Sequence, residues 1–460
     1  ILTKTMEASE GFRKLSEKRL RVVTKPQYID EAPQKITGTV SEILSRIDER
    51  GTLDEVKSQL SLDAIFDKDI HALSGGELQR MAIAAVAIRD ADVYVFDEPS
   101  SYLDVYQRMA MAKLVQNLAR KSKYVIVAEH DLAVLDYISD QICLFYGKPG
   151  VYGIASKPHG VRVGINIYLN GFIPDENIRF REYAIRFHLS PTPNEWRSED
   201  IMMRWPDFKK SLGEFTLEAK PGSMHRGQVI GIVGANGTGK TTFVKVIAGI
   251  IQPSEGNIPP TGLTISYKPQ YVVPSSSKSV REILASISPD LLADQFLLDE
   301  VYGPLDIAPL LDRPTDSLSG GELQRTAVAV CLSRDAQIYL LDEPTAHLDV
   351  EHRLVISKAI RKVVEKRGCS AFVVEHDIVA NDLLADNVMV FSGDPGRSGI
   401  ANPPVNLRKG MNAFLKGAGI TFRRDPETGR PRVNKRDSWL DRYQKEVGEF
   451  YYTEVTADDK

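Results

Sequence analysis

The sequence contains few cysteines and no long apolar run. Only three cysteines occur among 460 residues, at Cys143, Cys331 and Cys369, and no two of them form a CxxC pair. This argues against a structural zinc or iron–sulfur site within these residues and favours a reducing compartment, with each thiol serving as a small buried side chain. No run of about eighteen apolar residues exists, so the sequence predicts no membrane-spanning helix.

An excess of charge of either sign is also missing. The formal net charge is −4, the charged fraction is 26% and the apolar fraction is 42%, which are ordinary values for a globular protein. A molecule with this balance does not attract nucleic acid as a whole, so any polyanion binding has to come from local basic patches. The length fits about two or three domains, each large enough to bury its own core.

The sequence repeats itself over a long distance. LSGGELQR occurs at Leu73–Arg80 and again at Leu318–Arg325, and each copy is followed by an apolar run that ends in Asp-Glu-Pro. Four landmarks recur in the same order at a nearly constant separation: Gln27 with Gln270, Ser74 with Ser319, Asp97 with Asp342, and His130 with His376. A period this long indicates a domain duplication rather than a solenoid.

The two halves are not equally complete. A phosphate-binding sequence, GANGTGKT at Gly234–Thr241, occurs only once, in the second half. The start of the chain, ILTKTMEASEGF, has neither an initiator Met nor a signal-peptide pattern. We therefore expect the chain to be a fragment whose first half has lost the segment that carried its own P-loop.

Both halves show the pattern of α/β domains. Short apolar runs predict parallel strands that are covered on both faces, and helical periodicity predicts buried helices that follow each LSGGELQR and the P-loop. The predicted strands are Val93–Phe96, Tyr124–Val127, Val229–Val233, Ile338–Leu341 and Ala371–Val374, and the predicted helices are Met81–Ile88, Thr241–Ala248 and Thr326–Leu332.

Two further segments combine arginine with turn or aromatic residues, which is typical of linkers and tails. Their basic residues are Arg179, Arg181 and Arg186 in residues 164–189, and Arg423, Arg424, Arg430, Arg432, Lys435 and Arg436 in residues 403–460.

We therefore predict a first nucleotide-binding domain over residues 1–160, a hinge over 161–195, a second, complete nucleotide-binding domain over 196–400, and a second hinge with the C-terminal tail over 401–460.

GANGTGKT lies between a predicted strand and a predicted helix, which is the context that a P-loop requires. Glycine lets backbone N–H groups turn toward phosphate oxygens, Lys240 is predicted to reach the β and γ phosphates, and Thr241 is predicted to place its hydroxyl on Mg²⁺. The predicted ATP-binding residues of this segment are Gly234, Asn236, Gly237, Thr238, Gly239, Lys240, Thr241 and Thr242.

The residues after the second apolar run carry the predicted chemistry. Asp342 ends a strand near the P-loop and is predicted to hold Mg²⁺ through water, and Glu343 is predicted to polarise the attacking water as a general base. His376 is predicted to contact the γ-phosphate or that water. Gln270 is predicted to sense both the metal and the γ-phosphate.

Two other features concern the nucleotide. The SGGE part of each LSGGELQR supplies a serine hydroxyl and free N–H groups at a helix start, which is a second kind of phosphate cradle. An aromatic side chain that stacks on adenine is expected before the P-loop. Trp205 is the first candidate, beside Phe208 and Phe215, although core packing explains all three equally well.

Together these motifs resemble those of ATP-binding-cassette ATPases over nearly all of Thr24–Val390. The resemblance implies two tandem P-loop nucleotide-binding domains that face head to tail, with ATP held between the P-loop of one and the signature of the other. ATP on Gly234–Thr242 is then closed by Ser74, Gly75 and Gly76. The other site uses a P-loop absent from this sequence together with Ser319, Gly320, Gly321, Gln27, Asp97 (on Mg²⁺), Glu98 and His130.

Finer matches resemble the soluble class E family, the ribosome-recycling ATPases also called RNase L inhibitors. The matching stretches are KPQYID, LSGGELQRMAIA, FDEPSSYLDVYQR, AEHDLAVLDYISD, GINIYLNGFIPDENIRFRE and GRPRVNKRDSWLDRYQKE. This resemblance implies that two bound ATP molecules draw the cassettes together. Closure splits post-termination ribosomes, and the protein stays on the small subunit, which links termination to initiation.

The resemblance also implies cofactors, partners and a compartment. The cofactors are ATP, Mg²⁺ and, in an N-terminal domain absent from this sequence, two [4Fe–4S] clusters. The partners are the small ribosomal subunit with its RNA and proteins, termination or rescue factors, and initiation factors, with RNA contacted by the basic hinges. The compartment is the cytoplasm, with the nucleus as a second one.

Two other functions are consistent with the ATPase motifs alone. The first is the ATPase subunit of a membrane transporter, which predicts a membrane partner on the surfaces around Gln27 and Gln270. The second is a class F translation factor, which predicts an extended charged helical linker, whereas this linker contains Gly and Pro.

Overall fold

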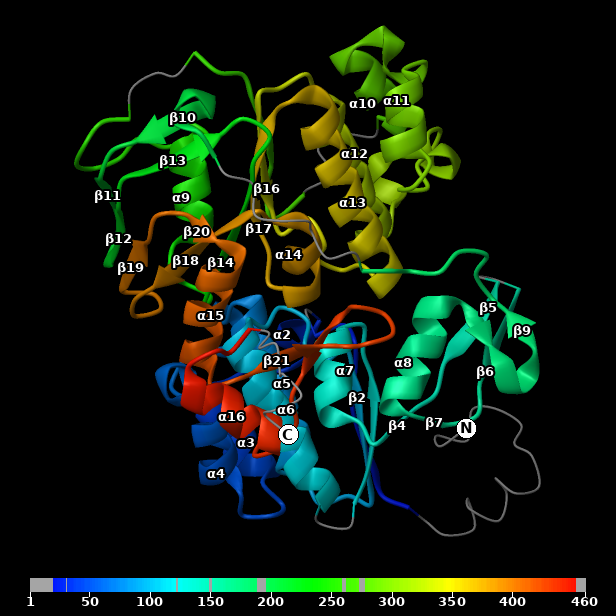
Figure 1. Ribbon diagram of the computed structural model, residues 1–460. Coiled ribbons are helices and arrows are strands. Elements are labelled where there is room, and N and C mark those ends of the chain that lie inside the picture. The colour runs from blue at the N-terminus through cyan, green and yellow to red at the C-terminus, as the bar shows by residue number, and fades with distance from the viewer. Residues whose placement is uncertain are drawn as a thin grey trace. The chain divides into compact units, whose positions relative to one another are not determined.

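The computed structural model describes residues 20–29, 31–120, 123–148, 151–187, 196–258, 262–272 and 278–451. The chain divides into two compact units, residues 1–140 and 141–460 (Figure 1). The start of the sequence, on which the expectation of a fragment rests, lies outside the described residues. The division falls before residue 160 because β4 (Gln141–Ile142) pairs with β7 (His159–Gly160) inside the second unit. The predicted four-part division stays a prediction.

The first unit is built on a three-stranded parallel sheet in the order β1-β2-β3. Leucine, isoleucine and methionine side chains of its helices pack with the apolar residues of β2 to form the core. The strands are β1 (Val22–Lys25), β2 (Val93–Asp97) and β3 (Tyr124–Ala128), and the helices are α2 (Ala32–Lys35), α3 (Val40–Ile47), α4 (Leu53–Gln59), α5 (Gly75–Ala87), α6 (Val105–Arg120) and α7 (Leu132–Ile138).

Strand β3 differs from its prediction. Tyr124 is 72% exposed and Ile126 is 51% exposed, so the strand is not covered on both faces. The exposed residues alternate along the strand, so no described element covers that face of β3, which also has β2 as its only strand partner among the described residues. Its counterpart in the repeat, β17, lies between two strands and is buried throughout.

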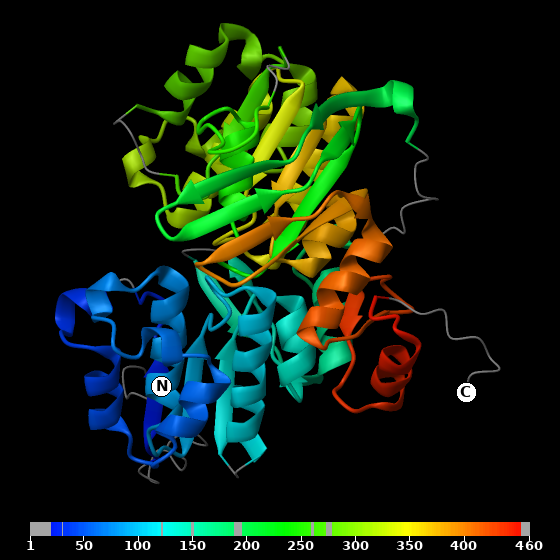
Figure 2. The same ribbon diagram turned by 90° about the vertical axis from the view of Figure 1, so that its left-hand side faces the viewer.

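The second unit contains a nine-stranded sheet in the order β11-β12-β19-β18-β14-β17-β16-β15, with β20 paired to β18. The strands from β18 to β15 run parallel, and β11 and β12 form an antiparallel hairpin beside β19, seen face-on in Figure 2. The strands of this sheet are β11 (Phe208–Leu212), β12 (Phe215–Ala219), β14 (Val229–Gly234), β15 (Ile265–Lys268), β16 (Ile338–Asp342), β17 (Ser370–Val374), β18 (Asn387–Ser392), β19 (Ser398–Ala401) and β20 (Val405–Asn406).

Helices and small sheets surround this large sheet. The helices are α8 (Val161–Asn170), α9 (Lys240–Ile247), α10 (Val280–Ile287), α11 (Gln295–Leu297), α12 (Gly320–Ser333), α13 (Val350–Arg367), α14 (Ile378–Leu384), α15 (Leu407–Ala418) and α16 (Trp439–Val447). The remaining strands are β5 (Phe145–Lys148), β6 (Tyr152–Ala155), β8 (Phe172–Ile173), β9 (Ile178–Arg179), β10 (Ile201–Trp205), β13 (Gly222–His225), β21 (Phe422–Arg424) and β22 (Pro431–Val433).

The central strands of this sheet contribute side chains to two separate hydrophobic cores, one on each face. Tyr339 and Leu341 of β16 pack into a cluster with α12 and α13, whereas Ile338 and Leu340 of the same strand pack into a cluster with Phe243 of α9. Successive side chains of a strand point to opposite faces, so a continuous apolar run is what a sheet covered on both sides requires. This burial fixes the end of β16 next to the loop that leads into α9.

Two expectations concern the burial of the three cysteines and the absence of a membrane-spanning helix. Cys331 and Cys369 are buried free thiols, as predicted, but Cys143 is exposed, so its prediction as a buried side chain is wrong. Cys143 directly follows the short strand β4 and lies between two buried residues, Ile142 and Leu144, with its own side chain on the outer face. Within the described parts of the chain, no helix combines the length and the apolar character that crossing a membrane requires.

Candidate nucleotide-binding and hydrolysis site

The loop between β14 and α9 has the shape of a phosphate cradle. Gly234, Gly237 and Gly239 adopt φ values of 156°, 76° and 91°. A Cβ on Gly234 would lie 2.7 Å from atoms of Phe391, and one on Gly239 would lie 2.9 Å from the ring of Phe215. Glycine therefore allows a close approach that a side chain would prevent, and α9 begins directly after the loop with its N-terminal N–H groups toward it.

Lys240 folds over this loop. Its Nζ donates to the carbonyl oxygens of Gly234 at 3.0 Å and Ala235 at 2.8 Å, and the residue is 6% exposed. The hydroxyl of Thr238 donates to the same Ala235 carbonyl at 2.7 Å. The ammonium is thus held where the helix dipole also favours an anion, so phosphate oxygens can replace the carbonyls as acceptors. The other predicted residues lie alongside, Asn236 in the loop and Thr241 and Thr242 in the first turn of α9.

Asp342, the last residue of β16, carries a buried carboxylate. It is 0% exposed, and among the described residues only the Thr241 hydroxyl lies close to its oxygens, without the geometry of a good hydrogen bond. Burial raises the pKa of Asp342, against the opposing effects of the Thr241 hydroxyl and of Lys268 and Lys240. A buried carboxylate with so few hydrogen bonds is costly, and a divalent cation with oxygen ligands removes that cost. Asp342 and Thr241 therefore fit the predicted Mg²⁺.

Glu343 occupies a strained turn directly after Asp342, with φ 47°. Its Oε1 accepts a hydrogen bond from Gln270 Nε2 at 2.9 Å and lies 3.3 Å from His376 Nε2. Burial alone would raise the pKa of Glu343, but His376, followed by Lys240 and Gln270, lowers it to about 2. Bound phosphates would add negative charge, which raises the pKa of a nearby carboxylate and makes it a better base. The structure thus brings the predicted second-half residues together.

The first unit has the same arrangement around Glu98. This glutamate has φ 45°, accepts a hydrogen bond from Gln27 Nε2 at 2.6 Å, and lies 3.6 Å from His130 Nε2. Asp97 ends β2 just as Asp342 ends β16. The duplication found in the sequence is therefore also a duplication of geometry.

A buried lysine in each unit supports the catalytic turn. Lys25 Nζ donates to the carbonyl oxygens of Asp97 at 2.8 Å and Glu98 at 3.3 Å, and Lys268 makes the equivalent pair of bonds at the end of β16, at 2.9 and 3.0 Å. Burial lowers the pKa of both lysines to about 8, against the pull of the nearby carboxylates. Sequence reasoning missed these residues, although the repeated Lys-Pro-Gln was the signal that could have identified them.

The signature helices also reach the catalytic turns. Gln79 Nε2 donates to the Glu98 carbonyl at 2.8 Å, and Gln324 Nε2 donates to the Glu343 carbonyl at 2.6 Å. These glutamines belong to LSGGELQR, but the sequence analysis assigned them no role. Each signature helix is therefore tied to the general-base turn of its own unit.

Serine begins each signature helix, as predicted. Ser74 caps α5 and Ser319 caps α12, each in a capping box with the glutamate of the motif. A Cβ on Gly75 would lie 3.3 Å from the ring of Tyr102 in the same unit, which explains a residue without a side chain there. The first N–H groups of both helices have no intrahelical acceptor and can bind phosphate oxygens. Gly76 and Gly321 continue the first turns.

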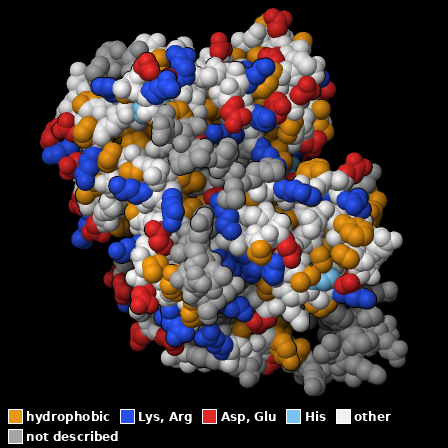
Figure 3. All heavy atoms as spheres, viewed as in Figure 1, with side chains coloured by type: hydrophobic (Ala, Val, Ile, Leu, Met, Phe, Trp, Pro, Cys, Tyr) orange, Lys and Arg blue, Asp and Glu red, His pale blue; other side chains and the backbone are white. Residues whose placement is uncertain are grey.

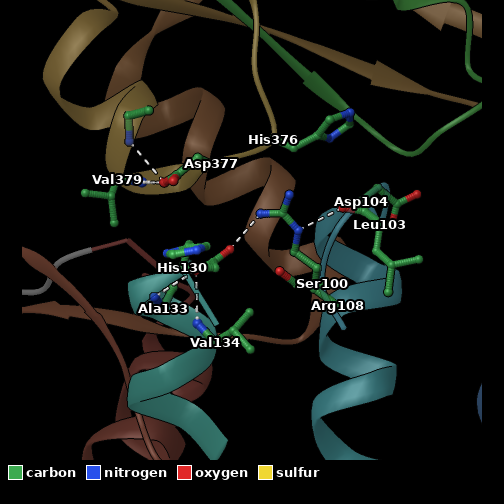
Figure 4. A network of polar contacts seen from close by, with 12 residues as sticks. Ser100, Leu103, Asp104, Arg108, His130, Ala133, Val134, His376, Asp377 and Val379 are labelled. Atoms are coloured by element: carbon green, nitrogen blue, oxygen red, sulfur yellow. Dashed lines mark hydrogen bonds and ion pairs between the residues drawn. The ribbon is translucent and has the colours of Figure 1, made fainter. Parts of the chain in front are cut away.

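Arginine–aspartate pairs fix the helices that follow the two histidines. Arg108 of α6 pairs at 2.6 Å with Asp131, whose carboxylate also caps α7 by accepting two backbone N–H groups (Figure 4). Arg353 of α13 pairs at 3.3 Å with Asp377, which caps α14 in the same way. Each pair ties the helix that begins after the histidine to a neighbouring helix, α7 to α6 and α14 to α13. The position of each histidine is therefore held by this packing.

The structure corrects the prediction for adenine stacking. Trp205 is 2% exposed, its ring packs edge-on against Phe372, and its indole N–H donates to a backbone carbonyl at 3.0 Å. Phe208 belongs to the same core. A side chain enclosed in the core cannot stack on a base, so the prediction of Trp205 is wrong. Phe215 is half-buried with its ring against Gly239, which makes it the better candidate.

Several arginines of the basic hinges are buried. Arg181 lies beside the rings of Tyr168 and Tyr183, and Arg430 is 0% exposed. Arg424 makes two hydrogen bonds of 2.8 Å to the carboxylate of Asp382. These arginines are therefore not available to RNA, and the predicted RNA contact of the hinges, which stays a prediction, depends on the other basic residues. The exposed basic residues described in these segments are Arg179, Arg186, Arg408, Lys409, Lys416, Lys435, Arg436 and Arg442.

Comparison with known proteins gives consistent matches. The ABC transporter family matches residues 3–101 and 219–346. An uncharacterized ABC transporter ATP-binding protein of Methanocaldococcus jannaschii is 49% identical over 97% of this chain and 74% of that protein. Translation initiation factor RLI1 of Chaetomium thermophilum is 44% identical over 98% of this chain and 74% of that protein. The crystal structure of an archaeal ribosome recycling factor in complex with the ribosomal stalk protein aP1 has a TM-score of 0.92 and 51% identity, over 96% of this chain and 85% of that chain.

Proposed function

The chain belongs to the class E family of ATP-binding-cassette ATPases, and we propose that it uses ATP to separate ribosomal subunits after termination. It is an ATPase with two tandem nucleotide-binding domains. The observation that carries the proposal is the pair of catalytic clusters within one chain, whose similarity to a ribosome recycling factor extends through the two hinges.

We assign a role to each part of the second site, supported by the contacts described above. The P-loop backbone and Lys240 bind the phosphates of ATP. Asp342 and Thr241 would hold Mg²⁺, which neutralises phosphate charge when it is bound. Glu343 accepts a proton from the attacking water, and His376 and Gln270 orient its carboxylate through the contacts at 3.3 and 2.9 Å.

Closure of the site supplies the mechanical step. Ser74, Gly75 and Gly76 of the first half complete the phosphate shell around ATP bound at the P-loop. In the other composite site, which Glu98 serves, the same role falls to Ser319, Gly320 and Gly321. ATP favours the closed state because it contacts both halves only there, and hydrolysis removes that preference.

The proposed partners follow from the family. They are the small ribosomal subunit with its RNA and proteins, termination or rescue factors, and initiation factors, and the compartments are the cytoplasm and the nucleus. Basic and acidic side chains are interspersed over the face drawn in Figure 3, so RNA binding rests on local basic residues of the hinges. Two [4Fe–4S] clusters in an N-terminal domain also stay a prediction, and the described residues contain no cluster of His, Cys, Asp and Glu suited to a metal.

Co-sedimentation with small ribosomal subunits tests this function. With a non-hydrolysable ATP analogue and Mg²⁺, we expect association at least about tenfold stronger than without nucleotide, because only the closed state fits the subunit. Replacing Lys435, Arg436 and Arg442 by Gln should weaken association and reduce its salt dependence. The matched control is Lys358→Gln, which removes an exposed charge from α13.

Two outcomes would contradict the proposal. One is no association in the presence of the analogue, and the other is association that is equal with and without nucleotide. Co-purification with integral membrane proteins instead of ribosomes would favour a transporter subunit.

A further inference from the structure

A glutamate directly precedes each of the two histidines. Glu375 stands before His376 and is 4% exposed, and Glu129 stands before His130. In each unit one carboxylate oxygen of this glutamate, Oε1, accepts the backbone N–H of the histidine at 2.8 Å and that of the next residue, an aspartate, at 3.0 Å. The carboxylate therefore fixes the backbone that carries the histidine side chain.

The second carboxylate oxygen reaches the turn of the general base. Glu375 Oε2 accepts a hydrogen bond of 2.6 Å from the hydroxyl of Thr345, which lies two residues after Glu343. In the first unit, Glu129 Oε2 accepts the backbone N–H of Ser100, at the position that matches Thr345, at 3.2 Å. One side chain thus bridges the segment of the histidine and the segment of the base.

Every polar group of Glu375 has a hydrogen-bond partner. Burial, followed by the nearby Asp377 carboxylate, raises the pKa of Glu375, and the Thr345 hydroxyl and the Asp377 N–H oppose this effect. A carboxylate at this depth is costly unless donors satisfy it, and three donors hold its two oxygens. Its carbonyl accepts from the amide of Asn381 at 3.0 Å, and its N–H donates to the Ile232 carbonyl at 3.3 Å. Glu375 is therefore a fixed point from which other groups can be held.

The base and the histidine need such a fixed point because they stand on separate segments. His376 Nε2 lies 3.3 Å from Glu343 Oε1, but Glu343 follows β16 and His376 lies beyond β17. The pairing of these two strands ends at Asp342 and Val374, so the ladder of the sheet does not hold the residues beyond it in register. The bridge through Glu375 joins the two segments where the ladder stops.

We propose that Glu375 is a positioning residue for ATP hydrolysis, which holds His376 at its working distance from Glu343. The hydrogen bond from Thr345 completes the bridge. Because backbone and hydroxyl donors occupy both oxygens, the carboxylate acts through the histidine rather than on ATP. This inference rests on the proposed roles of Glu343 and His376, and it assigns Glu129 the same task in the first unit.

Removal of the carboxylate gives the first test. The sequence carries one P-loop, so ATP hydrolysis by this chain reports the site that Glu343 serves. We expect Glu375→Ala to lower kcat about tenfold to 100-fold while KM for ATP changes less than about threefold, because a misplaced His376 affects the transition state more than ATP binding. Glu375→Gln should keep kcat within about threefold, since its amide oxygen can accept both N–H groups and its NH₂ can donate to the Thr345 oxygen.

Removal of the hydroxyl tests the other end of the bridge with less disturbance of the core. Thr345→Val should lower kcat about threefold to tenfold, the effect of one hydrogen bond, and Thr345→Ser should restore it. The matched control is Ser357→Ala, which removes a buried hydroxyl that donates to a backbone carbonyl of α13 at 2.9 Å, and its kcat should stay parental.

A background without the histidine separates positioning from damage to the fold. In His376→Ala, adding Glu375→Ala should lower the residual kcat by no more than about twofold, because no imidazole is left to place. The proposal is overturned by a parental kcat in Glu375→Ala or Thr345→Val, by an equal loss in Glu375→Gln, or by an undiminished loss in the His376→Ala background. A parental kcat in His376→Ala alone would instead overturn the role assigned to that histidine, so the two failures are distinguishable.

Discussion

Glu343→Gln is expected to lower kcat for ATP hydrolysis by about 10² to 10⁴ while ATP still binds, because general-base catalysis is lost and the P-loop is untouched. Glutamine has nearly the same shape and keeps a carbonyl oxygen for the hydrogen bond that Gln270 donates at 2.9 Å. The substitution therefore removes proton acceptance with little change in packing. Single-turnover hydrolysis together with equilibrium binding of ATP measures the two effects separately.

The matched control for this variant is Glu365→Gln. Glu365 is exposed on α13, where it pairs with Arg361 at 2.9 Å. We expect its kcat to remain parental, because exposed ion pairs of this kind contribute little. Hydrolysis by Glu343→Gln at the parental rate would show that another group activates the water.

Lys240→Met is expected to weaken ATP binding by about 10- to 100-fold, since it removes a charge-assisted hydrogen bond to phosphate. Methionine fills a similar space but cannot donate to the loop carbonyls that accept from Lys240 at 3.0 and 2.8 Å. Hydrolysis should fall with binding, because the γ-phosphate is no longer positioned. Titration with a fluorescent ATP analogue gives the Kd directly.

The control for this variant lies on the same helix. Lys245 of α9 is half-buried and has no predicted contact with phosphate, so Lys245→Met should bind ATP as the parent does. Thermal unfolding of both variants shows whether the loop keeps its fold. Parental ATP affinity in a folded Lys240→Met would contradict the placement of the phosphates.

Much of the site could be predicted because its chemistry is encoded locally. The P-loop needs glycines at fixed spacing before a helix, and the Asp342–Glu343 pair ends an apolar strand, so a short stretch of sequence contains the whole signal. Because the sequence is duplicated, the roles of the first-half residues could be predicted from their counterparts in the second half. In the structure each glutamate lies beside the glutamine and the histidine of its own half, and their roles in catalysis stay predictions.

The missed features depend on packing between distant residues. Lys268 contacts a carbonyl 74 residues later in the sequence, and no local pattern indicates that partner. Trp205 and Phe215 both precede the P-loop as aromatic residues, and only the folded core decides that the first is enclosed and the second borders Gly239. Exposure of alternate residues of β3 likewise depends on whether another element covers that face of the sheet, which the apolar composition of the strand does not reveal.

The proposed function requires the first-half signature to close the second-half P-loop when ATP is bound. Occlusion of ATP in a Glu343→Gln background tests it most directly, as ATP retained after rapid gel filtration. We expect Ser74→Arg, which places a bulky side chain at the start of α5, to abolish retention, and the matched Ser319→Arg at the start of α12 to preserve it. Loss of retention in Ser319→Arg with full retention in Ser74→Arg would contradict the claim.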